Sequence, residues 1–288
     1  MTAYNVTTVK RHRKKLGMSR IVINLILIVC SLIWLYPIIW TVISSFKPQA
    51  DFFSEQLALI PSRITFENYA RVWSKANFAA YFLNSTIVTV FSVLLVLIMT
   101  NMAGYVLGRY KFVGRSVLMA VFLSSICIPL VSTLIPVYQI VKSMNLLGSR
   151  LGLILSGAGG AHVVFLLLFS SYYSTVPNEL EEAARMDGCG FLRTYVNVMV
   201  PLSSPISTTV IIMESLWTWN AFQLPLILTL NNPAARTLAV GLYAFKGENT
   251  VDWTGICTGA AIAMIPIIIV FIAFQKFFIN GMAGAVKG

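Results

Sequence analysis

Long apolar runs alternate with short polar segments along this chain, and the runs decide its structural class. Six of them approach the roughly 20 apolar residues that a helix needs to cross a bilayer. The first run, residues 21–43, is continuous rather than alternating, which predicts a helix and not a strand of a membrane barrel. We therefore predict an all-α polytopic integral membrane protein with six transmembrane helices, at residues 21–43, 79–107, 115–139, 151–175, 201–229 and 254–278.

Prolines interrupt the later runs. A proline inside a helix removes one backbone hydrogen bond and clashes with the preceding turn. In a membrane this is tolerated where neighbouring protein or a water-filled path satisfies the freed carbonyl. We expect kinks or helix ends at Pro129, Pro136, Pro205, Pro225 and Pro266.

Composition agrees with a membrane protein and gives no sign of an enzyme. The chain is 57% hydrophobic and 11% charged, against about 25% charged residues in soluble domains. The four cysteines are scattered without a C-x-x-C pair, so neither a disulfide framework nor a metal site is indicated. No nucleophile elbow, phosphate-binding glycine loop or carboxylate pair is visible. We predict no catalytic residues, no metal and no bound cofactor on this chain.

The net charge of +11 reflects membrane topology. Six of the 21 basic residues precede the first span, in a tail at residues 1–20. The positive-inside rule then places this tail and, with six spans, both termini in the cytoplasm. A basic tail beside anionic lipid explains the charge without nucleic acid. The first run exceeds the 7–15 residues of a signal-peptide core, so we expect a retained helix.

A polar segment between the fourth and fifth runs carries both charge signs. Asn178 can cap a helix that follows Pro177, and the acidic residues at 179, 181 and 182 would complement its dipole. Small side chains at Ala183 and Ala184 would allow a partner surface to approach closely. Gly188 and Gly190 are expected to end the helix. From these residues alone, a docking helix and an ordinary solvated helix remain equally open.

The order of residues in this segment resembles the E-A-A loop of ABC importer permeases. The matching positions are Glu182-Ala183-Ala184, Asp187-Gly188, Phe191 and Pro201-Leu202. Three further stretches are similar to the maltose-type carbohydrate importers: Pro61 with Asn68-Tyr69, Trp219-Asn220 through Pro225, and residues 275–288. The resemblance covers essentially the whole chain after the N-terminal tail. Cys189-Gly190 is one mild departure, since a larger or more helix-friendly pair is common there.

This resemblance implies a type I ABC importer permease fold in a single transmembrane domain, residues 21–288, with a core at about 75–278. It implies that loop 177–200 contains a coupling helix that contacts a partner ATPase. The contact residues would be Glu182, Ala183, Ala184, Asp187 and Gly188, joined by Lys287 and Gly288 of a short cytoplasmic tail at 279–288. ATP and magnesium would bind to that ATPase.

The same resemblance implies an assembly in a bacterial cytoplasmic (inner) membrane. Its other members would be a second homologous permease, two copies of the ATP-binding subunit and an extracytoplasmic solute-binding protein. The cargo would be a sugar or oligosaccharide, moved inward.

Polar and aromatic residues in the fifth run mark a translocation path for such a cargo. Glu214 is a rare acid at membrane depth, and Trp217 shares its helical face. Trp219 and Asn220 suit a sugar contact too, but polar residues also hold helices together. We favour the packing role for these two.

Two other functions remain open at this stage. A related ABC permease could carry glycerol phosphate or another polar solute, although an anionic cargo should favour basic residues within the spans. A secondary transporter would show inverted repeats and several intramembrane carboxylates, whereas Glu214 is the one acid within a predicted span.

Overall fold

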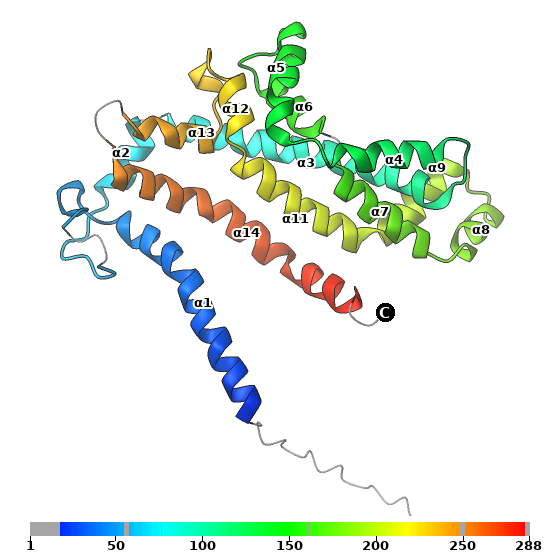
Figure 1. The fold of residues 1–288 in the computed structure, drawn as a ribbon, viewed down its shortest axis with the longest axis horizontal. Coiled ribbons are helices and arrows are strands. Elements are labelled where there is room, and N and C mark those ends of the chain that lie inside the picture. Colours follow the sequence, from blue (N-terminus) through cyan, green and yellow to red (C-terminus); the bar gives the residue numbers. More distant parts are fainter. Residues whose placement is uncertain (1–17, 55–57, 76, 161, 248–250, 286–288) are drawn as a thin grey trace, which may run out of the picture.

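The computed structural model describes residues 18–54, 58–75, 77–160, 162–247 and 251–285, and the regular structure in these ranges is helical (Figure 1). A lone antiparallel bridge between Lys246 and Val251 is the one β-type pairing within them. The predicted all-α class is confirmed.

The helices are α1 (Met18–Ser44), α2 (Glu67–Lys75), α3 (Phe78–Arg109), α4 (Arg115–Ser125), α5 (Leu134–Ser143), α6 (Arg150–Ala158), α7 (Val163–Thr175), α8 (Glu179–Met186), α9 (Phe191–Thr194), α10 (Val200–Leu202), α11 (Ser204–Asn220), α12 (Gln223–Leu228), α13 (Leu238–Leu242) and α14 (Trp253–Ala285), with a π-helix at Tyr195–Met199 between α9 and α10.

Three uninterrupted helices and three bent pairs account for the membrane spans. Among the described residues α1, α3 and α14 are long and apolar enough to cross a membrane unbroken. The other spans require two helices each: α4 with the segment through α5, α6 with α7, and the segment from α9 to α10 with α11. These pairs bend by 102°, 51° and 73° respectively. Length and composition thus allow the six predicted spans.

The predicted spans 115–139, 151–175 and 201–229 are all interrupted, and the helix break expected at Pro129 is confirmed. Pro129 adopts an extended conformation and separates α4 from the helices after it, as a residue without a backbone donor favours. His162 precedes α7 with a left-handed backbone, φ 31°. The fifth predicted span ends early because Ala221 is extended after α11. Its bent pair begins at Phe191, so residues 191–200, predicted as loop, are helical.

Three of the remaining prolines lie where helices begin, in agreement with the expected helix ends. Pro136, Pro205 and Pro225 each lie in the first turn of a helix, where the missing N–H has no intrahelical partner in any case. Pro266 lies inside α14, which continues past it.

Helix α3 forms the centre of the bundle, with α7, α11 and α6 packed along it (Figure 1). Gly104 and Gly108, spaced as a G-x-x-x-G pair, face α7. A β-carbon on Gly104 would overlap that of Phe169, and one on Gly108 would lie 2.6 Å from the carbonyl oxygen of Ser170. Small residues of this spacing allow helices to approach closely in membranes. The main buried cluster, which includes Tyr105, lies at this contact.

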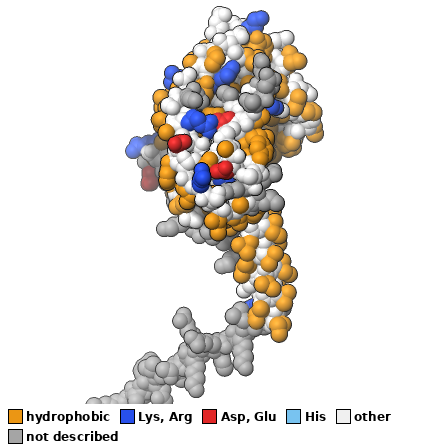
Figure 2. All heavy atoms as spheres, turned by 90° about the vertical axis from the view of Figure 1, so that its left-hand side faces the viewer, with side chains coloured by type: hydrophobic (Ala, Val, Ile, Leu, Met, Phe, Trp, Pro, Cys, Tyr) orange, Lys and Arg blue, Asp and Glu red, His pale blue; other side chains and the backbone are white. Residues whose placement is uncertain are grey.

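Helix α1 leaves the bundle and contacts only its neighbour α14 closely (Figure 1). None of its most apolar window is buried inside the chain. Figure 2 shows its hydrophobic side chains as a column below the main body. Such a surface requires lipid or another protein around it, because water would not solvate it.

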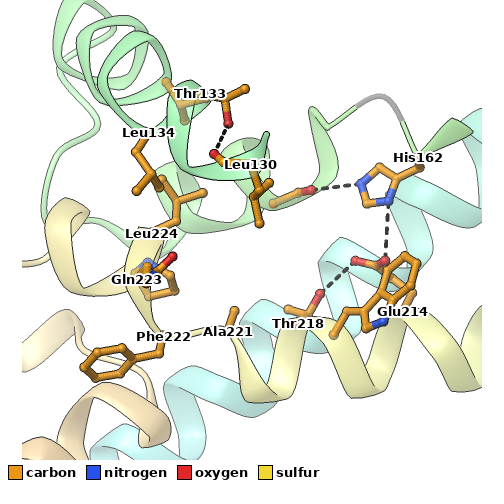
Figure 3. A pocket seen from close by; sticks show the side chains of 14 residues that line it. Leu130, Thr133, Leu134, His162, Glu214, Thr218, Ala221, Phe222, Gln223 and Leu224 are labelled. Atoms are coloured by element: carbon orange, nitrogen blue, oxygen red, sulfur yellow. Dashed lines mark hydrogen bonds and ion pairs between the residues drawn. The ribbon is translucent and has the colours of Figure 1, made fainter. Parts of the chain in front are cut away.

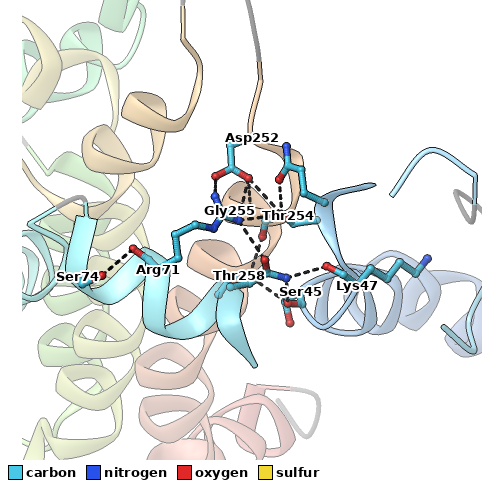
Figure 4. Close-up of polar contacts among 10 residues, drawn as sticks. Ser45, Lys47, Arg71, Ser74, Asp252, Thr254, Gly255 and Thr258 are labelled. Atoms are coloured by element: carbon cyan, nitrogen blue, oxygen red, sulfur yellow. Dashed lines mark hydrogen bonds and ion pairs between the residues drawn. The ribbon is translucent and has the colours of Figure 1, made fainter. Parts of the chain in front are cut away.

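A polar network ties the end of α1 to α2 and α14 (Figure 4). Arg71 of α2 forms an ion pair with Asp252, which precedes α14. Asp252 also accepts a hydrogen bond of 2.8 Å from the backbone N–H of Gly255, and so caps α14. Asn68 of α2 donates to the carbonyl oxygen of Ser45 at 2.9 Å, immediately after α1. One network therefore holds three helices that are distant in sequence.

We predict that Asp252→Ala destabilises the protein by about 1–2 kcal/mol, since it removes a helix cap and the partner of Arg71. The unfolding temperature of the detergent-purified protein should fall. Glu67→Ala, which removes an exposed acid from α2, is the control and should change stability by less than about 0.5 kcal/mol. Equal unfolding temperatures for the two variants would contradict the role given to Asp252.

Candidate functional site

Helix α8 and the two residues after it carry five of the seven residues predicted to contact an ATPase, and α8 lies at one end of the bundle (Figure 1). It begins at Glu179, as expected, with three acidic residues in its first turn. Asn178 has a helical backbone and makes no side-chain capping bond, so the capping role predicted for it was wrong. The first turn of α8 is instead held by Arg109 of α3, which donates to Glu181.

Gly188 ends α8 in a Schellman motif. Its φ is +79°, a conformation that costs glycine little. The N–H of Cys189 donates to the carbonyl of Ala184 at 2.9 Å, and the N–H of Gly188 donates to that of Arg185 at 3.0 Å. The prediction that Gly188 ends the helix is confirmed. Gly190, with φ −73°, instead precedes α9 as its N-cap residue.

The helix has an inner and an outer face. Glu181 and Ala184 are buried against the rest of the chain. Glu182, Ala183, Asp187 and Gly188 are exposed, and the outer face also carries Met186, of which 89% is exposed. Four of the five predicted contact residues on α8 and its end therefore face outward. Ala184 packs inward.

Arg109, at the end of α3, anchors the inner face of α8. Its Nε donates to Oε1 of Glu181 at 2.9 Å, and both side chains are nearly buried. Its Nη1 donates to the carbonyl oxygen of Val176 at 2.6 Å, in the turn before α8. The sequence did not predict this pairing, because nothing in the local pattern connects Arg109 with a residue 72 positions later.

Asn101 of α3 joins the segment after α8 to the bundle. Its side-chain oxygen accepts hydrogen bonds from the hydroxyls of Tyr173, at 2.8 Å, and Tyr195, at 2.7 Å. Its amide donates to the hydroxyl of Ser203 at 2.9 Å, at the bend before α11. All four residues are buried. Since Tyr195 begins the π-helix and Ser203 ends the bend, this buried group fixes the connection from α8 to α11.

The predicted C-terminal contacts, Lys287 and Gly288, lie outside the described residues. Helix α14 continues to Ala285. The tail predicted at 279–288 is therefore helical over its first seven residues.

A cavity of about 430 Å³ opens between α5, the α6–α7 junction, α11 and α12 (Figure 3). Glu214 and Trp217, two of the predicted path residues, line it. Oε1 of Glu214 accepts a hydrogen bond of 2.8 Å from the hydroxyl of Thr218. Oε2 lies 3.5 Å from Nδ1 of His162 and has no hydrogen-bond partner. His162, which was not among the residues predicted for the path, is thus brought to Glu214 by the break before α7.

Stacked rings form the wall beside this pair. The indole of Trp217 stacks on Phe165 with ring centroids 5.0 Å apart, and His162 also stacks on Phe165 at 5.9 Å. Phe165 is fully buried, whereas Trp217 is 50% exposed. One face of the indole is therefore covered by Phe165.

Trp219 and Asn220 do not line this cavity. The indole N–H of Trp219 donates to the carbonyl of Ala263 in α14 at 3.1 Å, and the side chain is buried. Asn220 donates to the carbonyl of Leu216 in its own helix at 2.8 Å. Trp219 thus bonds to a neighbouring helix, in agreement with the packing role favoured from the sequence, whereas Asn220 is exposed and its bond lies within α11.

Comparison with known proteins consistently finds membrane components of ABC transport systems. Residues 100–284 match the model of a family described as binding-protein-dependent transport system inner membrane component. The probable ABC transporter permease protein YurM of Bacillus subtilis is 34% identical, over 88% of this chain and 84% of that protein. The melibiose/raffinose/stachyose import permease protein MelC of the same species is 32% identical, over 85% of this chain and 88% of that protein. A bacterial ABC transporter involved in import of the acidic polysaccharide alginate has a similar chain structure, with a TM-score of 0.80, 25% identity, and coverage of 96% of this chain and 100% of that one.

We predict that Arg109→Ala loosens α8, because it removes the buried partner of the Glu181 carboxylate and leaves the mostly exposed Arg185, 3.8 Å away. Removal of one member of a buried pair costs about 3 kcal/mol, equivalent to roughly 100-fold faster amide exchange if α8 opens locally. Hydrogen exchange with mass spectrometry of peptides over 179–189 measures this. Arg193→Ala, an exposed arginine on α9, is the control; equal exchange in both variants would exclude the anchoring role.

Proposed function

The chain belongs to the family of binding-protein-dependent transport system inner membrane components, and we propose that it is the permease subunit through which an ABC importer moves a saccharide inward. The exposed outer face of α8 carries this proposal. It presents Glu182, Ala183, Asp187 and Gly188 at a short helix whose inner face is bonded to the rest of the chain. MelC, a relative over most of the chain, is an import permease for neutral oligosaccharides.

In the proposed mechanism a partner ATPase binds ATP and magnesium and contacts α8. Glu182, Ala183, Asp187 and Gly188 form the contact surface, with Met186 as an apolar anchor among them. Ala184 acts from the inner face by packing α8 against its own subunit. Movement of α8 reaches α3 through Arg109, and α11 through the Asn101 group. Coupling requires that the ATPase favour one arrangement of these helices over another.

The complete importer would contain a second homologous permease, two ATP-binding subunits and an extracytoplasmic solute-binding protein. Helix α1 supports a second membrane subunit, since its apolar surface has little contact with its own chain. We place α8 and both termini in the cytoplasm and the Arg71–Asp252 network outside. Lys287 and Gly288 would then emerge on the ATPase side. This chain would itself hold no cofactor and catalyse no reaction.

A related importer for glycerol phosphate or another anion fits the cavity less well. Among the described residues that line it, none is lysine or arginine. A buried anion without a cation is strongly disfavoured. A neutral saccharide needs only hydrogen bonds and an apolar surface.

The function is tested by purification of the tagged chain from its native membrane in mild detergent. An ATPase and a second permease should copurify. Proteoliposomes that contain this assembly, with its binding protein outside and ATP inside, should accumulate labelled melibiose or raffinose. Uptake by the chain alone, driven by an ion gradient, would instead support a secondary transporter.

We predict that Asp187→Lys and Gly188→Pro each lower ATP-driven uptake at least tenfold while the chain still inserts. Asp187→Lys reverses an exposed charge on the contact surface. Gly188→Pro cannot adopt the positive φ of the Schellman motif and lacks its N–H. Basal ATP hydrolysis should continue, uncoupled from transport.

The matched control for the backbone change is Gly190→Ala. Gly190 has a negative φ and open space around its missing β-carbon, so alanine should be tolerated. Normal uptake in both Asp187→Lys and Gly188→Pro would remove α8 from the coupling mechanism.

A further inference from the structure

We propose that the cavity between α5, α7, α11 and α12 is a saccharide subsite of this chain that selects neutral over acidic sugars. This inference rests on the proposed function and adds a binding site and a substrate class to it. Figure 3 shows Glu214 and Thr218 of α11 facing His162 across one end of the cavity. The volume of about 430 Å³ lies within the ~300–1,000 Å³ typical of ligand pockets.

Trp217 provides the apolar platform of the subsite. Its indole rests on the buried ring of Phe165, which fixes its orientation and covers one face. Half of the residue remains exposed, at the cavity. A sugar ring has apolar C–H faces that suit contact with such an aromatic surface. Because the platform is already in place, little side-chain entropy is lost when a ligand binds.

Glu214 provides a hydrogen-bond acceptor beside the platform. One carboxylate oxygen is engaged by Thr218, and the other has no hydrogen-bond partner although the residue is only 2% exposed. A buried acceptor without a partner is costly. A sugar hydroxyl that donates to Oε2 would remove this cost, and the same hydroxyl would gain a charge-assisted bond.

His162 lies beside this carboxylate and is itself held by the backbone. Its Nε2 lies 3.0 Å from the carbonyl oxygen of Gly157. A carbonyl only accepts, so Nε2 carries a proton. Nδ1 lies 3.5 Å from Oε2 of Glu214, beyond the usual length of a hydrogen bond. His162 is therefore a positioning residue, held by Gly157 beside the carboxylate.

These features together favour a neutral saccharide. The described lining residues include no lysine or arginine to receive a carboxylate, sulfonate or phosphate. An acidic sugar would bring its charge next to Glu214 with no new partner. Specificity of this kind arises from an unfavourable contact with the wrong ligand as much as from good contacts with the right one. Relatives of this chain include importers of both kinds of cargo, neutral for MelC and acidic for the alginate transporter.

The experiment is saturation-transfer difference NMR on the assembled importer in nanodiscs, with the solute-binding protein omitted. The probes are two trisaccharides at millimolar concentration, neutral raffinose and the acidic trimer of mannuronic acid. We expect signal transfer to raffinose and at least tenfold less to the acidic trimer. Trp217→Ala should reduce the raffinose signal about tenfold, whereas Trp217→Phe should keep much of it.

Glu214→Gln keeps the shape of the side chain and removes its charge. It should weaken raffinose binding several-fold and reduce the preference over the acidic trimer about tenfold. Asn220→Ala is the control, because Asn220 lies on the same helix but outside the cavity. It should leave both signals unchanged.

Two results would overturn the inference. Unchanged raffinose signals in Trp217→Ala and Glu214→Gln would place sugar binding elsewhere, and loss of the second permease from the Trp217→Ala assembly would identify the cavity as a subunit interface. ATP-driven uptake by the unmodified importer, measured in parallel, separates these outcomes from failure of the proposed function. An importer that transports melibiose or raffinose but fails the NMR test refutes only the subsite.

Discussion

The close contact of α3 with α7 is the packing constraint on which the rest of the structure depends. Gly104 and Gly108 remove two side chains from this contact, and α7 fills the space they leave. The approach brings Tyr173 within hydrogen-bonding distance of Asn101, and it places Arg109 beside the turn before α8. The hydrophobic effect contributes little to the association of helices within lipid. Close packing and buried hydrogen bonds must therefore stabilise this contact. Larger residues at the two glycines would separate α7 from α3 and remove both sets of contacts together.

The breaks in the helices lie where the chain needs irregular backbone. A bilayer tolerates an interrupted helix only where protein or a cavity satisfies the exposed backbone groups. Leu130, His162 and Ala221 each follow or form a break, and all three line the same cavity. At the bend before α11, Asn101 donates to the hydroxyl of Ser203, and this hydroxyl donates to the carbonyl of Val200. Broken spans therefore produce the cavity on one side of the bundle and a stiff connection to α8 on the other.

The sequence predicted what depends on local pattern and missed what depends on contacts between distant segments. Apolar runs were enough to locate α1, α3 and α14, because nothing interrupts them. The same runs concealed the breaks before α7 and after α11, since an average over 20 residues does not register one residue such as His162 with a positive φ. The position of α8 followed from its charges, glycine and resemblance. The inner face of α8 could also have been predicted, because Glu181 and Ala184 are three residues apart and share one side of a helix. The partner of Glu181 could not have been predicted, since Arg109 precedes it by 72 positions.

Helix α11 connects the two regions to which we assign function. Ser203, immediately before it, is bonded to Asn101, and Tyr195 of the adjacent π-helix is bonded to the same residue. Glu214 lies 11 residues further, or about 16 Å along a helix that rises about 1.5 Å per residue. An α-helix packed on α3 and α14 is stiff over that distance, so a rotation imposed at Ser203 must change the position of Glu214 relative to His162, which belongs to another segment. The pairing of these two side chains would then differ between the two states of the importer, and so would the affinity of the cavity for a sugar. Linkage requires the reverse effect to be equal: a sugar that binds better in one state stabilises the position of α8 in that state.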